Sequence, residues 1–294
     1  MSREEAQRLE AMIAARPKGA SLAERREGFE AMAARFGVPD GVLVEEVRLA
    51  SVPGRRVLAP GADPDRVLLW LHGGAFTVGS SASYTEMCAR LSAASGMAAV
   101  CIDYRLSPEH AYPAALDDAA AAWTALAEGP DAMTLGGDSC GGNLAVALTQ
   151  RLAREGGRRP DALYLVSPYL DLTHSGDSIA ARDHLDVFVR PETMPQTAAA
   201  YLGEARAGEP GVSPLLGEVS GFPPVLIHVG AHEVLYDDAA RLHQKLSAAG
   251  VASTLTEWED MPHVFAFFGP MLDEARRATT MAGAWLAEQT VGGH

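Results

Sequence analysis

The sequence predicts an α/β fold with a mostly parallel central sheet and helices on both faces. From about residue 67, short apolar runs such as RVLLWLH and MAAVCIDY alternate with segments of helical length such as SYTEMCARLSAASG. Strands that alternate with helices in this way form parallel sheets that are covered on both sides. The chain has 294 residues, of which 48% are hydrophobic, so it can bury the core of one large α/β domain with insertions or of two smaller domains.

The first 40 or so residues are predicted to be helical and separate from the sheet. Ser21 and Glu24 have the spacing of a capping box, in which the two side chains bind free amides at a helix start. An apolar stripe at helical spacing follows, and Gly37 can end that helix. The runs VLVEEVRLASV and RRVLAP come next, around the turn dipeptide Pro53-Gly54, and they predict a hairpin that turns there.

The strand and helix alternation continues to the C-terminus with one interruption. It runs through PAALDDAAAAWTALAEG, DAMTLGG, GGNLAVALTQRLAREGG and ALYLVSPYL. It resumes with PPVLIHVG, LYDDAARLHQKLSAAG and STLTEWED before a final helix near residues 271–289. Between about residues 173 and 214 there are helical pieces but no convincing strand. We predict that this interval is an insertion packed over one end of the sheet.

Composition narrows the class of partner. A net charge of −14 and a pI near 5.0 argue against nucleic acid and anionic membranes, which attract basic patches. The N-terminus MSREEAQRLEAMIAARP has no apolar run of signal-peptide length, and no later stretch reaches the roughly 18 apolar residues of a membrane span, so a cytoplasmic protein is expected. Cys88, Cys101 and Cys140 lack metal-type spacing and are expected to be buried free thiols, and we expect no metal or cofactor.

The segment GGDSCGGN contains a G-x-S-x-G pattern between a predicted strand and a predicted helix. That context is the one a nucleophile elbow requires, with Ser139 on a sharp turn and the small residues Gly137 and Gly141 two positions to either side. A phosphate-binding loop would need a lysine after the glycines, where Asn143 and Leu144 stand instead. This motif alone is also compatible with a serine that only caps a helix.

A serine nucleophile needs a base, and the base needs an orienting acid. On a doubly wound hydrolase sheet they follow the serine in the order acid then histidine, each after a later strand. His263 lies just beyond the last predicted strand. Four candidates lie beyond the strand before it: His232, Glu233, Asp237 and Asp238. The order of these residues favours a catalytic Ser139 and His263 over isolated structural roles.

Acyl transfer also needs amides that bind the developing oxyanion. One is the amide after the nucleophile, here Cys140. The others come from an early glycine-rich loop after a strand, and HGGAF, which begins at His72, follows RVLLWLH in that position. The candidate donors in this loop are Gly73, Gly74 and Ala75.

These motifs together resemble the bacterial hormone-sensitive-lipase family of α/β-hydrolases, which are small carboxylesterases. The stretch DYRLSPEHAYPAALDD, SPYLDL and MPHVF match that family in order, and the resemblance covers the chain from about residue 66 to its end. It implies Ser139 as nucleophile, His263 as base and the amides of Gly74, Ala75 and Cys140 as oxyanion hole. It also implies a two-part helical cap, which would comprise residues 1–40 and 173–214 over a core of residues 41–172 and 215–294.

The chain departs from the family pattern at three positions. HGGA replaces the usual HGGG, and Ala75 keeps its amide but restricts the backbone. Cys140 stands where alanine is common, and we expect its amide rather than its thiol to act. Glu233 stands where aspartate is usual; we prefer it to Asp237 because the acid should follow its strand immediately. His72 is expected to brace its own loop. Asp103, Arg105 and Glu109 are expected to be scaffold residues with charge-assisted bonds.

The resulting hypothesis is a serine carboxylesterase that hydrolyses short- to medium-chain acyl esters through an acyl-enzyme. The cap and loops offer candidates for the acyl pocket: Phe76, Tyr84, Phe188, Tyr201, Leu202 and Val264. A lactone hydrolase or an amidase with the same triad is an alternative. A receptor that binds a small ligand without turnover is another, although the presence of His263 argues against it. A homodimer is compatible with the sequence.

Overall fold

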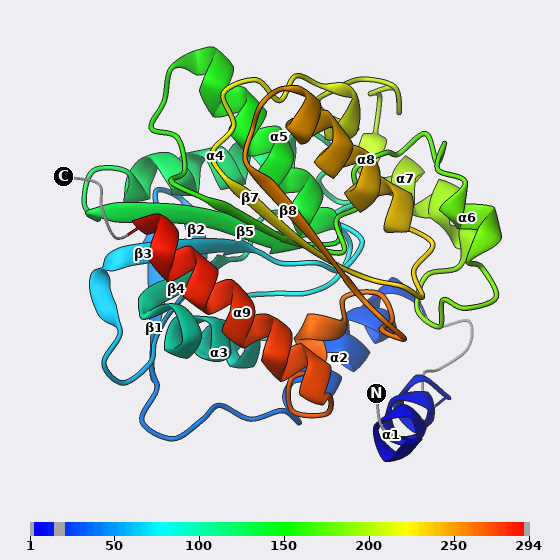
Figure 1. The fold of residues 1–294 in the computed structure, drawn as a ribbon, viewed down its shortest axis with the longest axis horizontal. Helices are drawn as coiled ribbons and strands as arrows, with labels where there is room; N and C mark the ends of the chain where they lie inside the picture. Colours follow the sequence, from blue (N-terminus) through cyan, green and yellow to red (C-terminus); the bar gives the residue numbers. More distant parts are fainter. Residues whose placement is uncertain (1–2, 15–20, 291–294) are drawn as a thin grey trace.

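The computed structural model describes residues 3–14 and 21–290 (Figure 1). Eight strands form one sheet in the order β1-β2-β4-β3-β5-β6-β7-β8. β1 and β2 pair antiparallel with each other, and β2 pairs antiparallel with β4, whereas every pairing from β4 to β8 is parallel. The strands are β1 (Leu43–Leu49), β2 (Val52–Leu58), β3 (Asp63–Leu71), β4 (Met97–Ile102), β5 (Ala132–Asp138), β6 (Leu163–Val166), β7 (Val225–Gly230) and β8 (Ser253–Trp258). The predicted mostly parallel sheet is confirmed.

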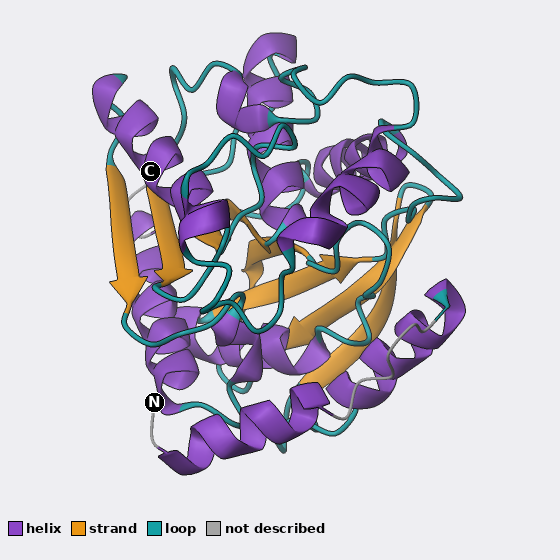
Figure 2. Cartoon of the chain, turned by 90° about the vertical axis from the view of Figure 1, so that its right-hand side faces the viewer, coloured by secondary structure: helices purple, strands orange, loops and turns teal. Residues whose placement is uncertain are grey.

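Helices cover both faces of the sheet. Figure 1 shows α3 and α9 on one side and α4, α5 and α8 on the other, and Figure 2 shows the twisted strands between the two layers. The helices are α1 (Arg3–Ala14), α2 (Leu22–Ala33), α3 (Thr85–Ser95), α4 (Ala114–Leu126), α5 (Cys140–Glu155), α6 (Ser178–Ala181), α7 (Met194–Leu202), α8 (Tyr236–Ala248) and α9 (Asp273–Thr290), with short 3₁₀ turns η1 (Pro191–Thr193), η2 (Pro214–Leu216) and η3 (Phe265–Phe268).

Alternate residues along a strand pack in two separate hydrophobic cores, one on each face of the sheet. On β3, Leu69 and Leu71 pack in the core that includes α4, α5 and α8, whereas Leu68 and Trp70 pack in the core that includes α3 and α9. This period of two is what a pleated strand imposes. Every residue of β4 and β5 is buried. Burial on both faces explains why these strands appear in the sequence as continuous apolar runs.

The predicted hairpin exists, but its turn is not at Pro53-Gly54. The strands join at Ala50 and Ser51, where Ala50 adopts a positive φ of 52°, and both Pro53 and Gly54 lie inside β2. A Cβ on Gly54 would lie 2.5 Å from the carbonyl oxygen of Cys101 on β4. Gly54 therefore permits close approach of β2 and β4. The turn prediction was wrong because a glycine in a turn and a glycine between two close strands look alike in sequence.

The predicted capping box at the start of α2 is confirmed. The Ser21 amide donates to Glu24 Oε2 at 2.8 Å, and the Glu24 amide donates to Ser21 Oγ at 3.3 Å. Residues 1–2 and 15–20 of the predicted N-terminal cap segment lie outside the described residues. The interval 173–214 contains helices and turns without a strand, as predicted.

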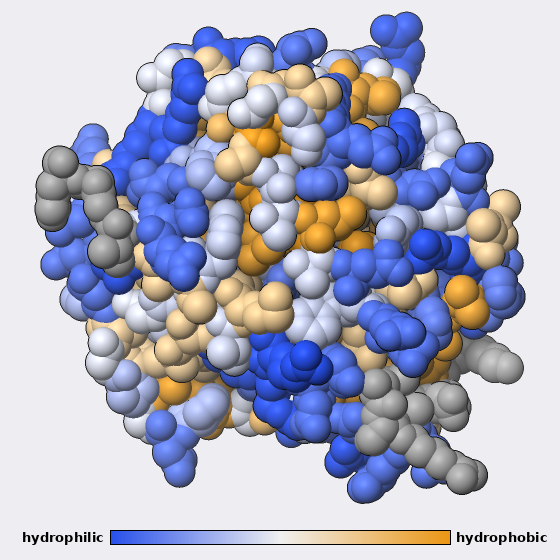
Figure 3. Space-filling model, viewed as in Figure 1, coloured by the Kyte–Doolittle hydropathy of each residue, from blue (hydrophilic) through white to orange (hydrophobic). Residues whose placement is uncertain are grey.

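Few large apolar side chains are exposed. Figure 3 shows hydrophobic residues gathered near the middle of the face seen in Figure 1, with hydrophilic residues around them. Within the described ranges, the exposed large hydrophobic residues are Val38, Leu43, Val44, Leu216 and Met281. Across residues 3–14 and 21–290, no helix combines the length and apolarity needed to cross a bilayer.

Gly28 in the middle of α2 offers a stability test. A Cβ at Gly28 would meet no atom within 4 Å, and its φ is not positive. Gly28→Ala is therefore expected to stabilise the fold by ~0.5–1 kcal/mol, because alanine loses less backbone entropy in a helix. Gly37 is the matched control, because its Cβ would also meet open space but its φ is +71°. Gly37→Ala is expected to destabilise by about 1 kcal/mol. Urea unfolding of both variants checks the pair, and shifts of the same sign would refute the backbone argument.

Candidate active site

Ser139 lies on a sharp turn between β5 and α5. Its φ of 51° and ψ of −121° are far from both strand and helix values. A Cβ on Gly137 would collide with the backbone of Gly141, and a Cβ on Gly141 would collide with the backbone of Leu71. The two glycines therefore let the chain reverse direction at Ser139, which is the backbone that the G-x-S-x-G pattern predicts.

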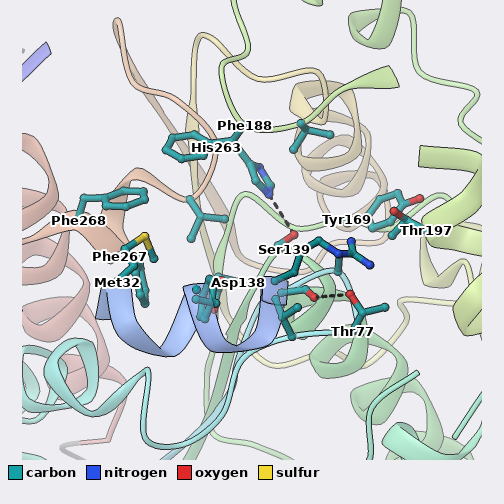
Figure 4. A pocket seen from close by; sticks show the side chains of 18 of the residues that line it. Met32, Thr77, Asp138, Ser139, Tyr169, Phe188, Thr197, His263, Phe267 and Phe268 are labelled. Atoms are coloured by element: carbon teal, nitrogen blue, oxygen red, sulfur yellow. Dashed lines mark hydrogen bonds between the residues drawn. The ribbon is translucent and has the colours of Figure 1, made fainter. Parts of the chain in front are cut away.

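His263 lies between Ser139 and Glu233. Its Nε2 is 3.0 Å from Ser139 Oγ, and its Nδ1 is 2.9 Å from Glu233 Oε2. Figure 4 shows the imidazole of His263 pointing at Ser139. The three residues follow β5, β7 and β8, whose carboxyl ends meet at one edge of the parallel sheet. This arrangement lets Nε2 accept the serine proton while Nδ1 donates to the carboxylate.

Glu233 is fully buried and its carboxylate is held by three donors. Oε1 accepts a hydrogen bond from Ser167 Oγ at 2.6 Å and from the Gly230 amide at 2.5 Å, and Oε2 faces His263. Burial raises the pKa of Glu233, and these hydrogen bonds oppose that shift. The carboxylate therefore has one fixed orientation, with Oε2 available to the imidazole.

Burial and the neighbouring carboxylates shift the pKa of His263 in opposite directions. Burial lowers the pKa, whereas the hydrogen bond and the charge of Glu233 raise it, with smaller contributions from Asp186 and Asp138. The net direction is upward from 6.5. The site therefore stabilises the imidazolium that forms when Nε2 takes up a proton.

Asp237, the rival acid, lies elsewhere. Its Oδ2 accepts a hydrogen bond from the amide of Ser178 at 2.9 Å, at the start of α6. Asp238 is also occupied, since its Oδ2 accepts from the amides of Leu170 and Asp171. The structure therefore brings Glu233, and neither aspartate, to His263.

Two predicted oxyanion donors have free amides. Gly74 directly follows Gly73 and has a φ of 120°. Its amide has no hydrogen-bond acceptor among the described residues. Cys140 opens α5, so its amide has no partner inside the helix. The Ala75 amide lies near the Cys140 sulfur and slightly opposes the rise in the pKa of that thiol. The arrangement thus leaves Gly74 and Cys140 with amides free to donate hydrogen bonds to a charged oxygen.

Gly73 differs from the prediction. Its amide donates to Asp138 Oδ1 at 3.0 Å and lies 3.1 Å from the Tyr84 hydroxyl. An amide already bound to a carboxylate is not available to an oxyanion. Gly73 therefore supports the loop and does not line the hole, a correction that depends on a contact between distant parts of the chain.

The Cys140 thiol is buried and protonated. Its sulfur accepts a hydrogen bond from the Phe76 amide at 3.1 Å. Burial raises the pKa of this thiol to about 12. A thiol with so high a pKa holds almost no thiolate at neutral pH, so it is a poor nucleophile.

Asp138 is a site residue that the sequence analysis missed. Its Oδ1 accepts from Trp70 Nε1 at 3.1 Å as well as from Gly73, and its Oδ2 accepts from the Tyr84 hydroxyl at 2.7 Å. Burial raises its pKa to about 6. Because Asp138 immediately precedes Ser139, this carboxylate connects the elbow to the oxyanion loop. The signal was an acidic residue inside the elbow motif.

Ser167 was missed as well. Its hydroxyl donates to Glu233 and accepts from the Val264 amide at 3.0 Å, so it joins Glu233 to the backbone beside His263. Its backbone φ is positive, at 47°. The sequence signal was its place at the start of SPYLDL, directly after β6.

The scaffold predictions for DYRLSPEH and His72 agree with the contacts. Arg105 pairs with Asp118, and Glu109 pairs with Arg26 on α2 at 2.7 Å. His72 Nδ1 is 2.8 Å from the Gly73 carbonyl, and burial lowers its pKa to about 4. Glu109 therefore anchors a helix of the N-terminal segment, a partner that the sequence did not indicate.

Ser139 and His263 open into a cavity of about 610 Å³. Three of the six predicted pocket residues line it, namely Tyr84, Phe188 and Val264. The other three do not. Phe76 stacks on Tyr201 with ring centroids 3.6 Å apart inside the core, and Leu202 packs against the same core. Sequence alone cannot tell an aromatic residue of the core from one of a pocket, because both are apolar.

Several lining residues were not predicted. They come from α2, from the oxyanion loop, from the loop after β6, from α7 and from η3, and include Arg25, Met32, Thr77, Tyr169, Thr197, Phe267 and Phe268. Met32 belongs to the apolar stripe of α2, and Phe267 and Phe268 follow His263 closely. Residues 188–197 of the insertion and residues 24–35 of the N-terminal segment thus enclose the same cavity.

Comparison with known proteins agrees with this geometry. Residues 68–267 match a family model described as the α/β hydrolase fold. An acetyl-hydrolase of Streptomyces hygroscopicus is 39% identical over 258 residues, which cover 87% of this chain and 85% of that protein. An esterase of Acinetobacter venetianus is 35% identical over 241 residues, covering 81% and 79%.

Solved structures are similar over nearly the whole chain. The crystal structure of an esterase from the bacterial hormone-sensitive lipase family superposes with a TM-score of 0.95 at 35% identity, covering 99% of both chains. A hormone-sensitive lipase from a metagenome library superposes with a TM-score of 0.93 at 32% identity, again covering 99% of both. Sequence and fold similarity of this extent show that the chain belongs to the bacterial hormone-sensitive-lipase family of α/β-hydrolases.

Proposed function

We propose that the chain is a serine carboxylesterase in which Ser139 is the nucleophile, His263 the general base and Glu233 the orienting acid. The observation that carries this proposal is the pair of contacts made by His263, at 3.0 Å to Ser139 Oγ and 2.9 Å to Glu233 Oε2. A serine hydroxyl is a weak nucleophile until a positioned base takes its proton. Membership of a family whose relatives are named esterases supports the same reaction.

The reaction proceeds in two steps. Ser139 Oγ attacks the ester carbonyl while its proton passes to His263 Nε2, and the oxyanion is bound by the amides of Gly74, Ala75 and Cys140. His263 then gives that proton to the leaving alkoxide, which departs as the alcohol and leaves an acyl-enzyme. Water attacks the acyl-enzyme with His263 again as base, which releases the acid and restores Ser139.

In this proposal the Ala75 amide exchanges one acceptor for another. In the free structure it interacts with the Cys140 sulfur, a weak acceptor. An oxyanion is a much stronger acceptor than a buried thiol. In this proposal Gly74 and Cys140 provide the preformed part of the hole, and Ala75 joins them when charge develops on the substrate.

The enclosing segments limit the acyl group. In this proposal residues 1–40 and 173–214 form a cap over the core of residues 41–172 and 215–294. Met32, Phe188, Phe267 and Phe268 provide apolar walls in a cavity of about 610 Å³. A cavity of this size suits short to medium acyl chains. A cytoplasmic location and a homodimer stay predictions of the sequence.

A series of p-nitrophenyl esters from acetate to palmitate tests this function. We expect kcat/KM to be highest for acyl chains of about two to eight carbons and to fall steeply for palmitate, because a long chain exceeds the cavity. A lactone and a p-nitroanilide in the same series test the two enzymatic alternatives. Turnover of none of the esters would overturn the esterase proposal and favour a receptor, whereas equal turnover of palmitate would overturn the size limit.

A further inference from the structure

The cavity around Ser139 has two chemically different ends. In Figure 4, Met32, Phe267 and Phe268 lie to one side of Ser139, and Thr77, Tyr169 and Thr197 lie to the other. The first end is apolar, whereas the second presents hydroxyl groups. An ester whose carbonyl carbon is at Ser139 extends its acyl and alcohol parts in different directions, so the two ends can select different chemistry in the two parts.

We place Arg25 at the polar end from its position on α2. It lines the cavity from α2, as do Gly28 and Met32, which lie at helical spacing on the same face. Nε of the neighbouring Arg26 donates to the Thr77 carbonyl at 2.8 Å, so this half of α2 is held at Thr77. Met32 is seven residues after Arg25, about 10 Å further along the helix axis, and it lies at the apolar end.

The guanidinium of Arg25 has no partner in the described part of the chain. Its neighbour Arg26 is neutralised by Glu109, with bonds of 2.8 and 2.7 Å. The nearby Glu24 carboxylate is engaged with Ser21 in the capping box. The other carboxylate that lines the cavity, Asp138, is enclosed by donors from distant residues. Arg25 thus offers donors that no carboxylate of the described residues occupies.

The net negative charge of the protein gives the position of Arg25 a meaning for anion binding. With a net charge of −14, the protein as a whole repels anions. An unpaired guanidinium at the polar end of the cavity therefore favours an anionic group at that point. Guanidinium groups bind carboxylates in a planar, two-bond geometry that neutral groups do not satisfy.

We propose that Arg25 binds a carboxylate of the substrate, so that the preferred substrates are esters with a free carboxylate remote from the scissile carbonyl. The inference rests on the proposed esterase function and names its substrate class. The hydroxyl of Thr197, which has no hydrogen-bond partner among residues 3–14 and 21–290, lies at the same end and can complete the contact. The carboxylate can belong to the acyl part or to the alcohol part, whichever occupies the polar end.

Two matched pairs of esters test the inference and separate these sources. For the acyl part, p-nitrophenyl hydrogen adipate is compared with p-nitrophenyl 5-carbamoylpentanoate. For the alcohol part, 3-carboxyphenyl butyrate is compared with 3-carbamoylphenyl butyrate. In each pair a carboxylate is replaced by a neutral carboxamide of nearly the same shape. The ratio of kcat/KM for the charged ester to that for the neutral ester is measured at low ionic strength, after subtraction of spontaneous hydrolysis.

We expect this ratio to exceed one for at least one pair and to fall about tenfold in Arg25→Gln, which is about 1.4 kcal/mol of transition-state binding. Arg25 is exposed, and glutamine is a good helix former, so the variant should fold. Arg35→Gln is the matched control, because it removes the same charge from the cavity lining beyond Met32, at the apolar end. Its ratio is expected to stay within about twofold of the wild type.

The outcomes distinguish this inference from the function on which it rests. If wild-type protein hydrolyses neither neutral ester, the esterase proposal fails. If the neutral esters are hydrolysed but the ratios are the same with and without Arg25, the esterase stands and the carboxylate inference is refuted. An equal fall in Arg35→Gln would also refute it, because a general field rather than a contact at the polar end would then explain the preference.

Discussion

Ser139→Ala is expected to reduce kcat for p-nitrophenyl butyrate by at least about 10⁴-fold, because it removes the atom that forms the acyl-enzyme. The elbow backbone should survive, since Gly137 and Gly141 determine the turn and alanine is smaller than serine. Residual activity would then come from the oxyanion amides and substrate binding alone. Steady-state rates and a burst measurement on the purified variant check this result, since a burst reports acyl-enzyme accumulation.

Cys140→Ala is the matched control for that variant. It removes the neighbouring nucleophilic atom but keeps the backbone amide that the oxyanion hole needs. We expect kcat to remain within about tenfold of the wild type, because the buried thiol has a pKa of about 12 and supplies no thiolate. An inactive Cys140→Ala beside an active Ser139→Ala would transfer the nucleophile assignment to the thiol.

Glu233→Gln is expected to lower kcat by about 10³- to 10⁴-fold, while Asp237→Asn should change it by less than about tenfold. The glutamine keeps the size of the side chain but loses the negative charge that stabilises the His263 imidazolium. Asp237 accepts from the Ser178 amide, so its substitution should affect the attachment of α6 and not the base. Reversed magnitudes would make Asp237 the acid.

The pH profile distinguishes loss of this charge from general damage. His263 must be neutral to accept the serine proton, so kcat/KM falls as pH falls through its pKa, which lies above 6.5. Glu233 is the main cause that raises this pKa against burial. In Glu233→Gln the acid limb should therefore move to lower pH, together with the loss of rate. An unchanged acid limb would show that Glu233 does not act through His263.

Local patterns predicted much of the fold because their physical causes are local. The capping box at Ser21 involves residues three positions apart, and its bonds form as expected. The strand and helix alternation reflects burial of each strand on both faces, which any parallel sheet requires. Pro53-Gly54 was the exception, because the close approach of β2 and β4 at Gly54 joins residues that are nearly fifty positions apart.

The candidate site also combines features that are local in the sequence with features that depend on contacts between distant segments. The glycine spacing around Ser139 is a local steric requirement of the elbow, and the order of serine, acid and histidine follows from the direction of a parallel sheet. The choice of Glu233 over Asp237 depended on which carboxylate meets His263 across a separation of 30 residues. The role of Asp138 depended on donors 54 to 68 residues away, and no short motif contains them.

The sequence by itself determined the parallel α/β architecture, the elbow at Ser139 and the residue types available for acid and base catalysis, because each follows from periodicity or from spacing along the chain. Only the tertiary structure decided that Gly73 supports Asp138, that Phe76 and Tyr201 pack in the core, and that Arg25 lines the cavity without a partner among the described residues. The physical reason is that these outcomes depend on which side chains from distant segments meet in space, and hydropathy does not distinguish a pocket wall from a core or a free charge from a paired one.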